Sequence, residues 1–209
     1  MIKLWGRTNS INVQKVLWTL RELGVPFERT DAGGAFGVVN EPAYRDMNPN
    51  GLVPTIQDGD MILWESNAIV RYLAARYGKG EFYPRNLAVR ADADRWMDWA
   101  TITFGIHVGP LFMQTIRTAP DKRDPAIIAN SHTQLAKLAP ILDAHLADRA
   151  FVAGNDFTMG DVPIGCQMYR YLMLTADARS ADEIPNVAAW YARLCARPAY
   201  REVVMLPLT

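Results

Sequence analysis

The chain has 209 residues, which is enough for one large domain or two small ones. Half of the residues are apolar, a proportion typical of globular proteins with a buried core. Basic and acidic residues number 22 each, so the formal net charge is zero, and no basic excess favours nucleic acid or an anionic membrane surface as a partner. Any ligand must therefore be recognised by a local site.

The number of cysteines and the hydropathy of the sequence predict the cellular compartment of the protein. Cys166 and Cys195 lie in apolar or helical sequence and are too few for a disulfide framework, which favours a reducing environment. Residues 1–10 are too short and too polar for a secretory signal. No apolar run approaches the roughly 20 residues that are needed to cross a bilayer. We therefore expect a cytoplasmic protein with no membrane partner.

Alternating strand and helix patterns occupy the first 80 residues. Residues Ile2–Trp5 and Phe27–Thr30 are predicted to be strands. Between them, apolar residues recur with helical spacing from Val13 onward, Asn9 or Ser10 can cap the start, and Gly24 marks the end. A helix of this length between two strands predicts a βαβ unit with a parallel strand pair.

The rest of this region predicts a glycine-rich loop, a short irregular helix, a hairpin and a final helix, over residues 33–42, 44–48, 54–64 and 66–77. The hairpin signal is Asp58-Gly59-Asp60 between two strand-like segments. This order of elements predicts a thioredoxin-like domain with a mixed sheet, over residues 1–80.

After a linker, every segment from residue 87 onward is predicted to be helical, and the expected helices span residues 87–118, 125–146, 161–175 and 186–196. Pro110 and Pro140 are expected to kink or interrupt their helices, and Arg197-Pro198 is expected to end the last one. The predicted class is α/β plus all-α, with an all-helical domain over residues 87–209.

The dipeptide Val53-Pro54 opens a predicted strand after a loop, which makes it a candidate for a cis peptide bond. A cis bond would turn the N–H and C=O of Val53 outward, where they could pair with a peptide backbone like an open strand edge. The alternative is an ordinary trans bond, because only roughly one X-Pro bond in twenty is cis in folded proteins.

Glu65-Ser66 joins a predicted strand to a predicted helix. The hydroxyl and N–H of Ser66 can hold a carboxylate at the helix N-terminus, while Glu65 can accept a hydrogen bond from an ammonium group. A ligand with an α-amino acid end fits this pair. The alternative is a plain helix cap.

Ser10 lies at the first strand–helix junction. A thiolate placed there would be stabilised by the helix N-terminus and by the serine hydroxyl, and Asn12 offers a second donor. Lowering a thiol pKa by about two units from about 8.5 requires roughly 2.7 kcal/mol, much of which one charge-assisted hydrogen bond can supply. The alternative is again a helix cap.

Other chemical patterns are not found in the sequence. The three histidines, His107, His132 and His145, have no metal-ligand spacing, and no dinucleotide, P-loop or hydrolase motif occurs. We therefore expect no metal. Thr158 and Asp161 have the spacing of a capping box, and Phe157 before them can act as a hydrophobic staple; both are folding signals.

These motifs together resemble the cytosolic glutathione S-transferases, specifically their serine-type, bacterial or theta-like members. The resemblance covers nearly the whole chain and rests on residues 10–16, 48–55, 65–69, 151–161 and 186–200. It implies glutathione as co-substrate, with the γ-glutamyl end at Glu65 and Ser66 and the cysteinyl backbone at Val53, beside a cis Pro54. The matching thiol-activating residue is Ser10, with Asn12 as its helper and Thr8 as the second choice.

The resemblance further implies conjugation of glutathione to small hydrophobic electrophiles in detoxification, by a homodimer. The expected electrophile pocket is formed by Ile11, Phe104, His107 and Leu111, with Leu206 and Leu208 as further candidates. Leu52 stands where some relatives bind the glycine end of glutathione with a polar residue, so the partner of the glycine carboxylate stays open. Two alternatives are glutathione-dependent reduction of disulfides or peroxides, and a non-catalytic glutathione-binding or interaction module.

Overall fold

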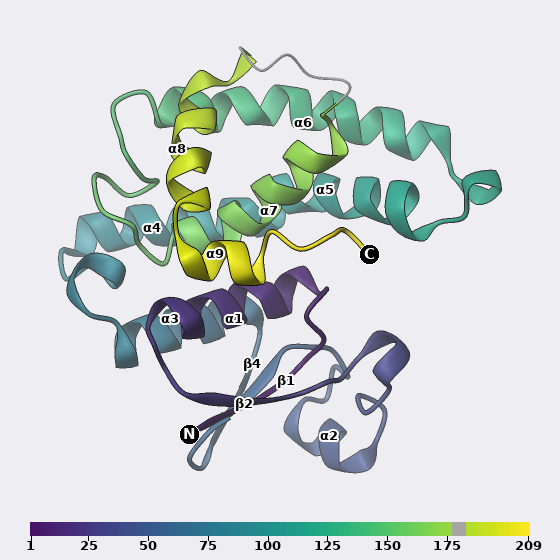
Figure 1. Ribbon diagram of the computed structural model, residues 1–209, viewed down its shortest axis with the longest axis vertical. Helices are drawn as coiled ribbons and strands as arrows, with labels where there is room; N and C mark the ends of the chain where they lie inside the picture. The colour runs from purple at the N-terminus through teal and green to yellow at the C-terminus, as the bar shows by residue number, and fades with distance from the viewer. Residues whose placement is uncertain (177–182) are drawn as a thin grey trace.

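A four-stranded mixed sheet forms one end of the protein in the computed structural model, which describes residues 1–176 and 183–209 (Figure 1). The strands are β1 (Ile2–Trp5), β2 (Phe27–Thr30), β3 (Thr55–Asp58) and β4 (Met61–Trp64), in the order β2-β1-β3-β4. β1 pairs in parallel with β2 and antiparallel with β3, and β3 pairs antiparallel with β4. The predicted parallel pair and hairpin are confirmed.

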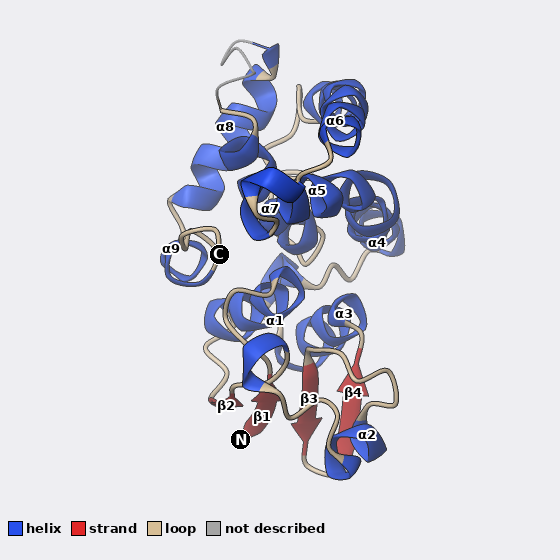
Figure 2. Ribbon diagram, turned by 90° about the vertical axis from the view of Figure 1, so that its right-hand side faces the viewer, coloured by secondary structure: helices blue, strands red, loops and turns tan. Residues whose placement is uncertain are grey.

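Helices cover both faces of this sheet. Figure 2 shows α1 (Ile11–Glu22) and α3 (Ser66–Tyr77) between the sheet and the remaining helices, and α2 (Pro42–Met47) on the opposite side. Two single turns, η1 (Gly34–Phe36) and η2 (Gly80–Phe82), complete the region. The thioredoxin-like N-terminal domain is thus confirmed, and α3 has the predicted bounds.

The helical part begins with one long helical stretch that alternates between α and π geometry. It consists of α4 (Leu87–Trp99), η3 (Ala100–Phe104), α5 (Gly105–Phe112) and η4 (Met113–Arg117), followed by the turn η5 (Pro120–Lys122). η3 and η4 are π-helical, with hydrogen bonds to the fifth residue back. Pro110 lies inside α5, between these two π-helical segments.

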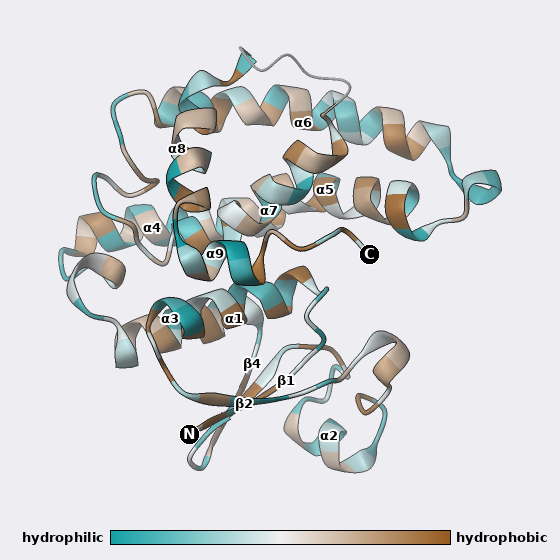
Figure 3. Cartoon of the chain, in the orientation of Figure 1, coloured by the Kyte–Doolittle hydropathy of each residue, from teal (hydrophilic) through white to brown (hydrophobic). Residues whose placement is uncertain are grey.

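The next helix, α6 (Pro125–His145), runs through Pro140, so of the predicted kink or interruption at this proline the interruption does not occur. It is followed by α7 (Asp161–Leu174), α8 (Pro185–Cys195) and α9 (Pro198–Val203). α9 was not predicted as a separate helix because Pro198 was interpreted only as a stop, whereas proline is also favoured at the first position of a helix. Figure 3 shows hydrophobic and hydrophilic segments alternating along α6 and α8, as expected for amphipathic helices.

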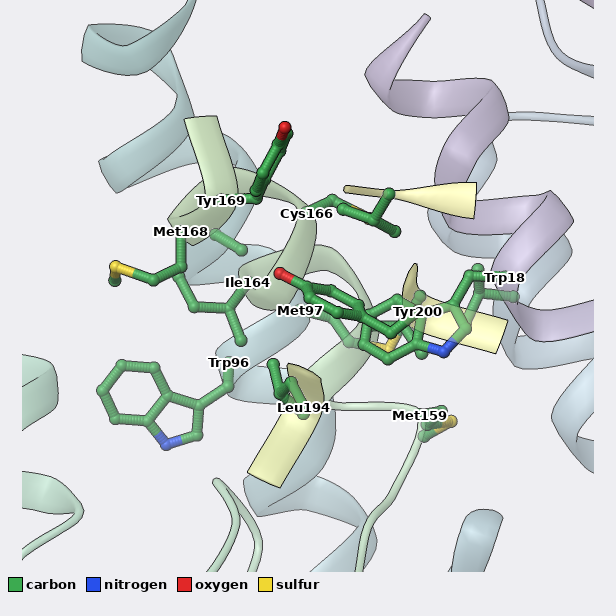
Figure 4. Close-up of a cluster of buried hydrophobic side chains, with 14 of the residues drawn as sticks. Trp18, Trp96, Met97, Met159, Ile164, Cys166, Met168, Tyr169, Leu194 and Tyr200 are labelled. Atoms are coloured by element: carbon green, nitrogen blue, oxygen red, sulfur yellow. The ribbon is translucent and has the colours of Figure 1, made fainter. Parts of the chain in front are cut away.

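One continuous core joins the sheet region to the helical region. The ring centroid of Trp18 on α1 lies 4.6 Å from that of Tyr200 on α9 and 5.4 Å from that of Phe157. Figure 4 shows Trp18 and Tyr200 side by side. The rim of this contact carries an ion pair between Glu22 and Arg197. In α1, all residues from 13 to 20 are buried, because one side packs on the sheet and α3 and the other on α7 and α9.

The predicted capping box before α7 is present with altered partners. Asp161 accepts the N–H of Thr158 at 2.9 Å, as the box requires, but the Thr158 hydroxyl accepts the N–H of Gly160 instead of that of Asp161. The carboxylate of Asp161 also accepts the N–H of Val152 and the indole N–H of Trp190, so it links three segments. Within residues 1–176 and 183–209, no helix has the length and hydrophobicity that a membrane span requires.

Candidate functional site

A cavity of about 130 Å³ opens between the loop before β3 and the start of α3. It brings together every residue predicted to bind glutathione and one predicted catalytic residue; its lining is Asn12, Asn48, Asn50, Leu52, Val53, Pro54, Trp64, Glu65 and Ser66. Asn48, Asn50 and Trp64 were not predicted to belong to it. Residues that are up to 54 positions apart in the sequence therefore share one pocket.

The Val53-Pro54 peptide bond is cis, as predicted from its place at the start of β3. No main-chain group of the described residues bonds to the N–H or C=O of Val53. The preceding carbonyl, of Leu52, is held by the hydroxyl of Tyr44 at 2.6 Å and by the side-chain amide of Asn48 at 2.9 Å. The loop that presents Val53 is thus fixed from behind while the polar groups of Val53 stay available to a ligand.

Tyr44 and Asn48 were missed as supports of the site. Both are buried, and both also bond the hydroxyl of Thr55 on β3, at 2.8 and 3.1 Å. Asn48 accepts the N–H of Asn50 as well, which closes the turn before Gly51. The sequence signal was the polar run 48–50 before the Val-Pro pair, but only the fold shows that Tyr44 completes this network.

Glu65 has a backbone φ of +71°, which is uncommon for a residue with a side chain and typical of ligand-binding sites. It is the residue that precedes α3, and its carbonyl accepts the N–H of Ile69 at 2.9 Å. Neither Glu65 nor Ser66 caps the helix with its side chain, so the alternative of a plain helix cap is not what the structure shows. The first N–H groups of a helix have no helical partner, and at α3 they belong to the end of the helix that lines the pocket with Ser66.

A buried lysine connects Asn12 to Ser66. The ammonium group of Lys15 donates to the side-chain oxygen of Asn12 at 3.0 Å and lies 3.5 Å from the hydroxyl of Ser66, which itself donates to Asn12 at 3.3 Å. Because the side-chain oxygen of Asn12 accepts both bonds, it is the oxygen and not the NH2 group of this side chain that faces Lys15. The site thus has a positive charge directly behind the hydroxyl that was predicted to hold a carboxylate.

Burial lowers the pKa of Lys15 to about 8, with the charge of Arg170 adding to the effect and Cys166 and Glu65 opposing it. Lys15 lies within one of the motifs that carry the family resemblance, but no role was predicted for it. The sequence did contain a signal for such a role, namely a lysine on a mostly apolar helix. A lysine is almost never fully buried without a partner. At neutral pH the charge remains, which favours an anionic ligand group beside Ser66.

We expect the free energy of unfolding to rise with pH between about 8 and 10.5 because of Lys15. The unfolded chain binds this proton up to the ordinary pKa of 10.5, whereas the folded chain releases it near 8, so the cost of burying the charge is fully present below pH 8 and falls above it. Lys15→Met should remove this rise, which is about 3 kcal/mol for a pKa lowered from 10.5 to about 8, in denaturant titrations. Lys137→Met, on the exposed face of α6, is the control, and parallel pH curves for wild type and Lys15→Met would contradict the expectation.

Ser10 immediately precedes α1, and its hydroxyl makes no capping bond to the helix. It is half-buried and lies two residues from Asn12, which lines the pocket. Thr8, the second candidate, faces a different cavity, of about 140 Å³, between β2 and α9. Ser10 itself does not line the pocket at Val53, so its choice over Thr8 as the thiol-activating hydroxyl stays a prediction.

The residues predicted for an electrophile pocket are only partly accessible. Phe104 and Leu111 have no exposed surface, and the ring of Phe104 packs on Trp99 with a centroid distance of 5.2 Å. The structure thus places these two in the core, because they fall on the inner side of the long helical stretch. Ile11 and His107 are half-buried and remain available to a ligand.

The fold and this site define the glutathione S-transferase family, and the chain belongs to it. The family models for the glutathione S-transferase N-terminal and C-terminal domains match residues 1–75 and 104–198.

Similar proteins include glutathione S-transferases from bacteria and plants. Glutathione S-transferase GstB of Escherichia coli is 45% identical over the full length of both chains. Glutathione S-transferase 3 of Zea mays is 31% identical and covers 97% of this chain and 93% of its own. The theta-class glutathione S-transferase of Xanthomonas axonopodis pv. citri, solved with glutathione bound, is 48% identical, with a TM-score of 0.93 over 100% of this chain and 99% of its own.

Proposed function

We propose that the protein transfers the thiolate of glutathione to a small, partly apolar electrophile, with Ser10 and Asn12 as its catalytic residues. Ser10 donates a hydrogen bond to the thiolate and is not itself a nucleophile. The sulfur attacks the electrophilic carbon, a C–S bond forms, the leaving group departs with its bonding electron pair, and the thiol proton passes to solvent.

The observation that carries the proposal is the single pocket that joins Val53, Glu65 and Ser66. The unpaired backbone of Val53 suits the cysteinyl residue of glutathione. Ser66, backed by the ammonium of Lys15, suits the α-carboxylate of the γ-glutamyl residue, and Glu65 suits its α-ammonium. Leu52 and Pro54 complete the wall of the pocket.

The proposal is tested by calorimetric binding of glutathione and by turnover of 1-chloro-2,4-dinitrobenzene with release of chloride. Binding with turnover is the expected result. Turnover of a mixed glutathione disulfide without any reaction of the aryl chloride would favour the reductase alternative, and binding without either reaction would favour the non-catalytic module. Failure to bind glutathione would overturn the glutathione assignment itself.

Glu65→Gln is expected to weaken glutathione binding about tenfold, the effect of losing one exposed charge-assisted hydrogen bond to the α-ammonium group. The substitution keeps the size of the side chain, so the backbone at the start of α3 should not change. Titration calorimetry measures the effect directly. The control is Glu41→Gln, which removes the same charge from the residue before α2; equal affinities for Glu65→Gln and this control would contradict the role of Glu65.

We also propose a homodimer in the cytoplasm. The support for association is a set of exposed apolar side chains on the edge strand β4 and on the long helical stretch; they are Ile62, Trp64, Leu87, Ile102, Ile106 and Met113. Figure 2 shows β4 and α4 on the same side of the molecule. Both cysteines are free, which suits a reducing compartment. Sedimentation equilibrium should give twice the chain mass at micromolar concentration, and a monomer mass would contradict the proposal.

A further inference from the structure

Three arginines gather beside Ser10, and no carboxylate side chain of the described residues forms an ion pair with any of them. Arg7 lies in the loop between β1 and α1, Arg117 ends η4, and Arg170 lies in α7. They influence one another electrostatically, since the charge of Arg117 acts on both of the others. Like charges disfavour the charged form of one another, and a bound anion would relieve this repulsion.

Arg170 is the innermost of the three, with 7% of its surface exposed. Its guanidinium carbon lies 4.0 Å from the ring centre of Phe112, and one terminal nitrogen donates to the carbonyl of Asn9 at 3.2 Å. Its Nε is buried without any partner in the described part of the chain. Burial, followed by repulsion from Arg117 and Arg7, lowers the pKa of Arg170 to about 10. A buried donor without an acceptor is costly, and it marks a place where a ligand oxygen would be stabilising.

Arg117 lies over the same Phe112 ring, at 5.1 Å, and already binds an oxygen of the chain itself. Its Nε and one terminal nitrogen donate to the main-chain oxygen of Thr209 at 3.2 and 2.7 Å. The side chain of Asn9 donates to the hydroxyl of the same residue at 2.9 Å. Figure 1 shows this last segment running past the start of α1. The tail therefore already provides an oxygen acceptor for Arg117, whereas within the described residues the Nε of Arg170 has none.

Arg7 connects this cluster to the proposed glutathione site. A Cβ atom placed on Gly33 would lie 2.9 Å from a terminal nitrogen of Arg7 and 3.3 Å from a methyl carbon of Val53. The guanidinium group thus lies alongside the residue that is proposed to hold the cysteinyl part of glutathione. The absence of a side chain at Gly33, which has a φ of +79°, provides the room for it.

We propose that Arg7, Arg117 and Arg170 form a carboxylate-binding subsite for the electrophile, so that the substrates are electrophiles with an apolar reactive body and a carboxylate group. This inference rests on the proposed transferase function and names its substrate class. The planar guanidinium fork matches the two oxygens of a carboxylate, which favours a carboxylate over other anions. The ring of Phe112 is buried under Arg117 and Arg170, and the half-buried Ile11, at the start of the helix that follows Arg7, offers apolar surface.

The test compares two aryl chlorides that differ only in charge, 4-chloro-3,5-dinitrobenzoate and 4-chloro-3,5-dinitrobenzamide. In both, the glutathione sulfur adds to the carbon that carries chlorine, the C–S bond forms, and chloride leaves with the bonding pair. The ratio of kcat/KM for the acid to that for the amide, divided by the same ratio for the uncatalysed reaction, measures the subsite. We expect a value of about ten or more in the wild type, as one charge-assisted hydrogen bond produces.

Arg117→Gln and Arg7→Gln should each bring this ratio down by about tenfold, whereas Arg85→Gln, which removes an exposed charge before α4, should not. A wild-type ratio near one would overturn the subsite. So would a variant that raises the KM for glutathione with both substrates alike, because the cluster would then bind the glycine carboxylate of glutathione. Absence of turnover of the uncharged amide and of the acid, with glutathione bound, would instead contradict the transferase function itself.

Discussion

Asp161→Ala is expected to lower the free energy of unfolding by about 3–5 kcal/mol, the range for breaking a buried charged network. The carboxylate accepts hydrogen bonds from the N–H groups of Val152 and Thr158 and from the indole of Trp190, at 2.9 to 3.0 Å, and it has no exposed surface. Alanine would leave these three donors buried without an acceptor. Each such donor costs about 1–3 kcal/mol.

Urea denaturation followed by circular dichroism measures this loss. Asp161→Asn should also destabilise the fold. Both oxygens of Asp161 accept N–H groups, so the NH2 group of asparagine would face at least one N–H donor. The control is Asp156→Ala, an exposed acidic residue five positions earlier, for which we expect a change within about 0.5 kcal/mol. A loss below about 1 kcal/mol for Asp161→Ala would show that the network contributes little net stability.

Ser10→Ala is expected to reduce kcat about 100-fold near pH 6.5, with a smaller effect on glutathione affinity. Removing the hydroxyl donor should raise the pKa of the bound thiol by about two units, which corresponds to roughly 2.7 kcal/mol. Less thiolate is then present at acidic pH, and the rate should recover as the pH rises toward the higher pKa. The absence of a side-chain cap at Ser10 means that the fold should not be affected by the loss of a cap.

Two measurements check this result, the pH profile of kcat and the ultraviolet absorbance of the bound thiolate. Thr8→Ala is the matched control, because Thr8 carries the same kind of hydroxyl two residues away but faces another cavity. If Thr8→Ala moves the thiol pKa and Ser10→Ala does not, the assignment of the two residues must be exchanged.

Features that depend on local sequence were predictable. The bounds of α3 follow from the apolar spacing within Ser66–Tyr77, and the hairpin follows from the turn around Gly59. Pro198 shows the limit of this approach, since the same residue type ends one helix and begins the next, and only packing decides between them. The capping box at Thr158 was recognised, but its true partners became visible only in three dimensions.

The site was predictable where its motifs are contiguous and unpredictable where they depend on packing. Val53-Pro54 and Glu65-Ser66 meet in one pocket, as the resemblance implied. Lys15 could not be assigned because its role depends on how α1 faces α3. Phe104 was assigned to the electrophile pocket from the family resemblance, but its ring packs on Trp99 and Tyr171 and has no exposed surface, which depends on packing between helices.

The complete burial of the middle of α1 has a consequence for how such proteins can be divided or recombined. Trp18 packs on aromatic rings that belong to the last third of the chain, so an isolated fragment ending at the linker would expose this ring and the apolar side chains around it. A chimera of this N-terminal region with the helical region of another protein would fold only if that region had apolar side chains shaped to pack around Trp18. The two regions are thus distinct in sequence but share one hydrophobic core in the folded protein.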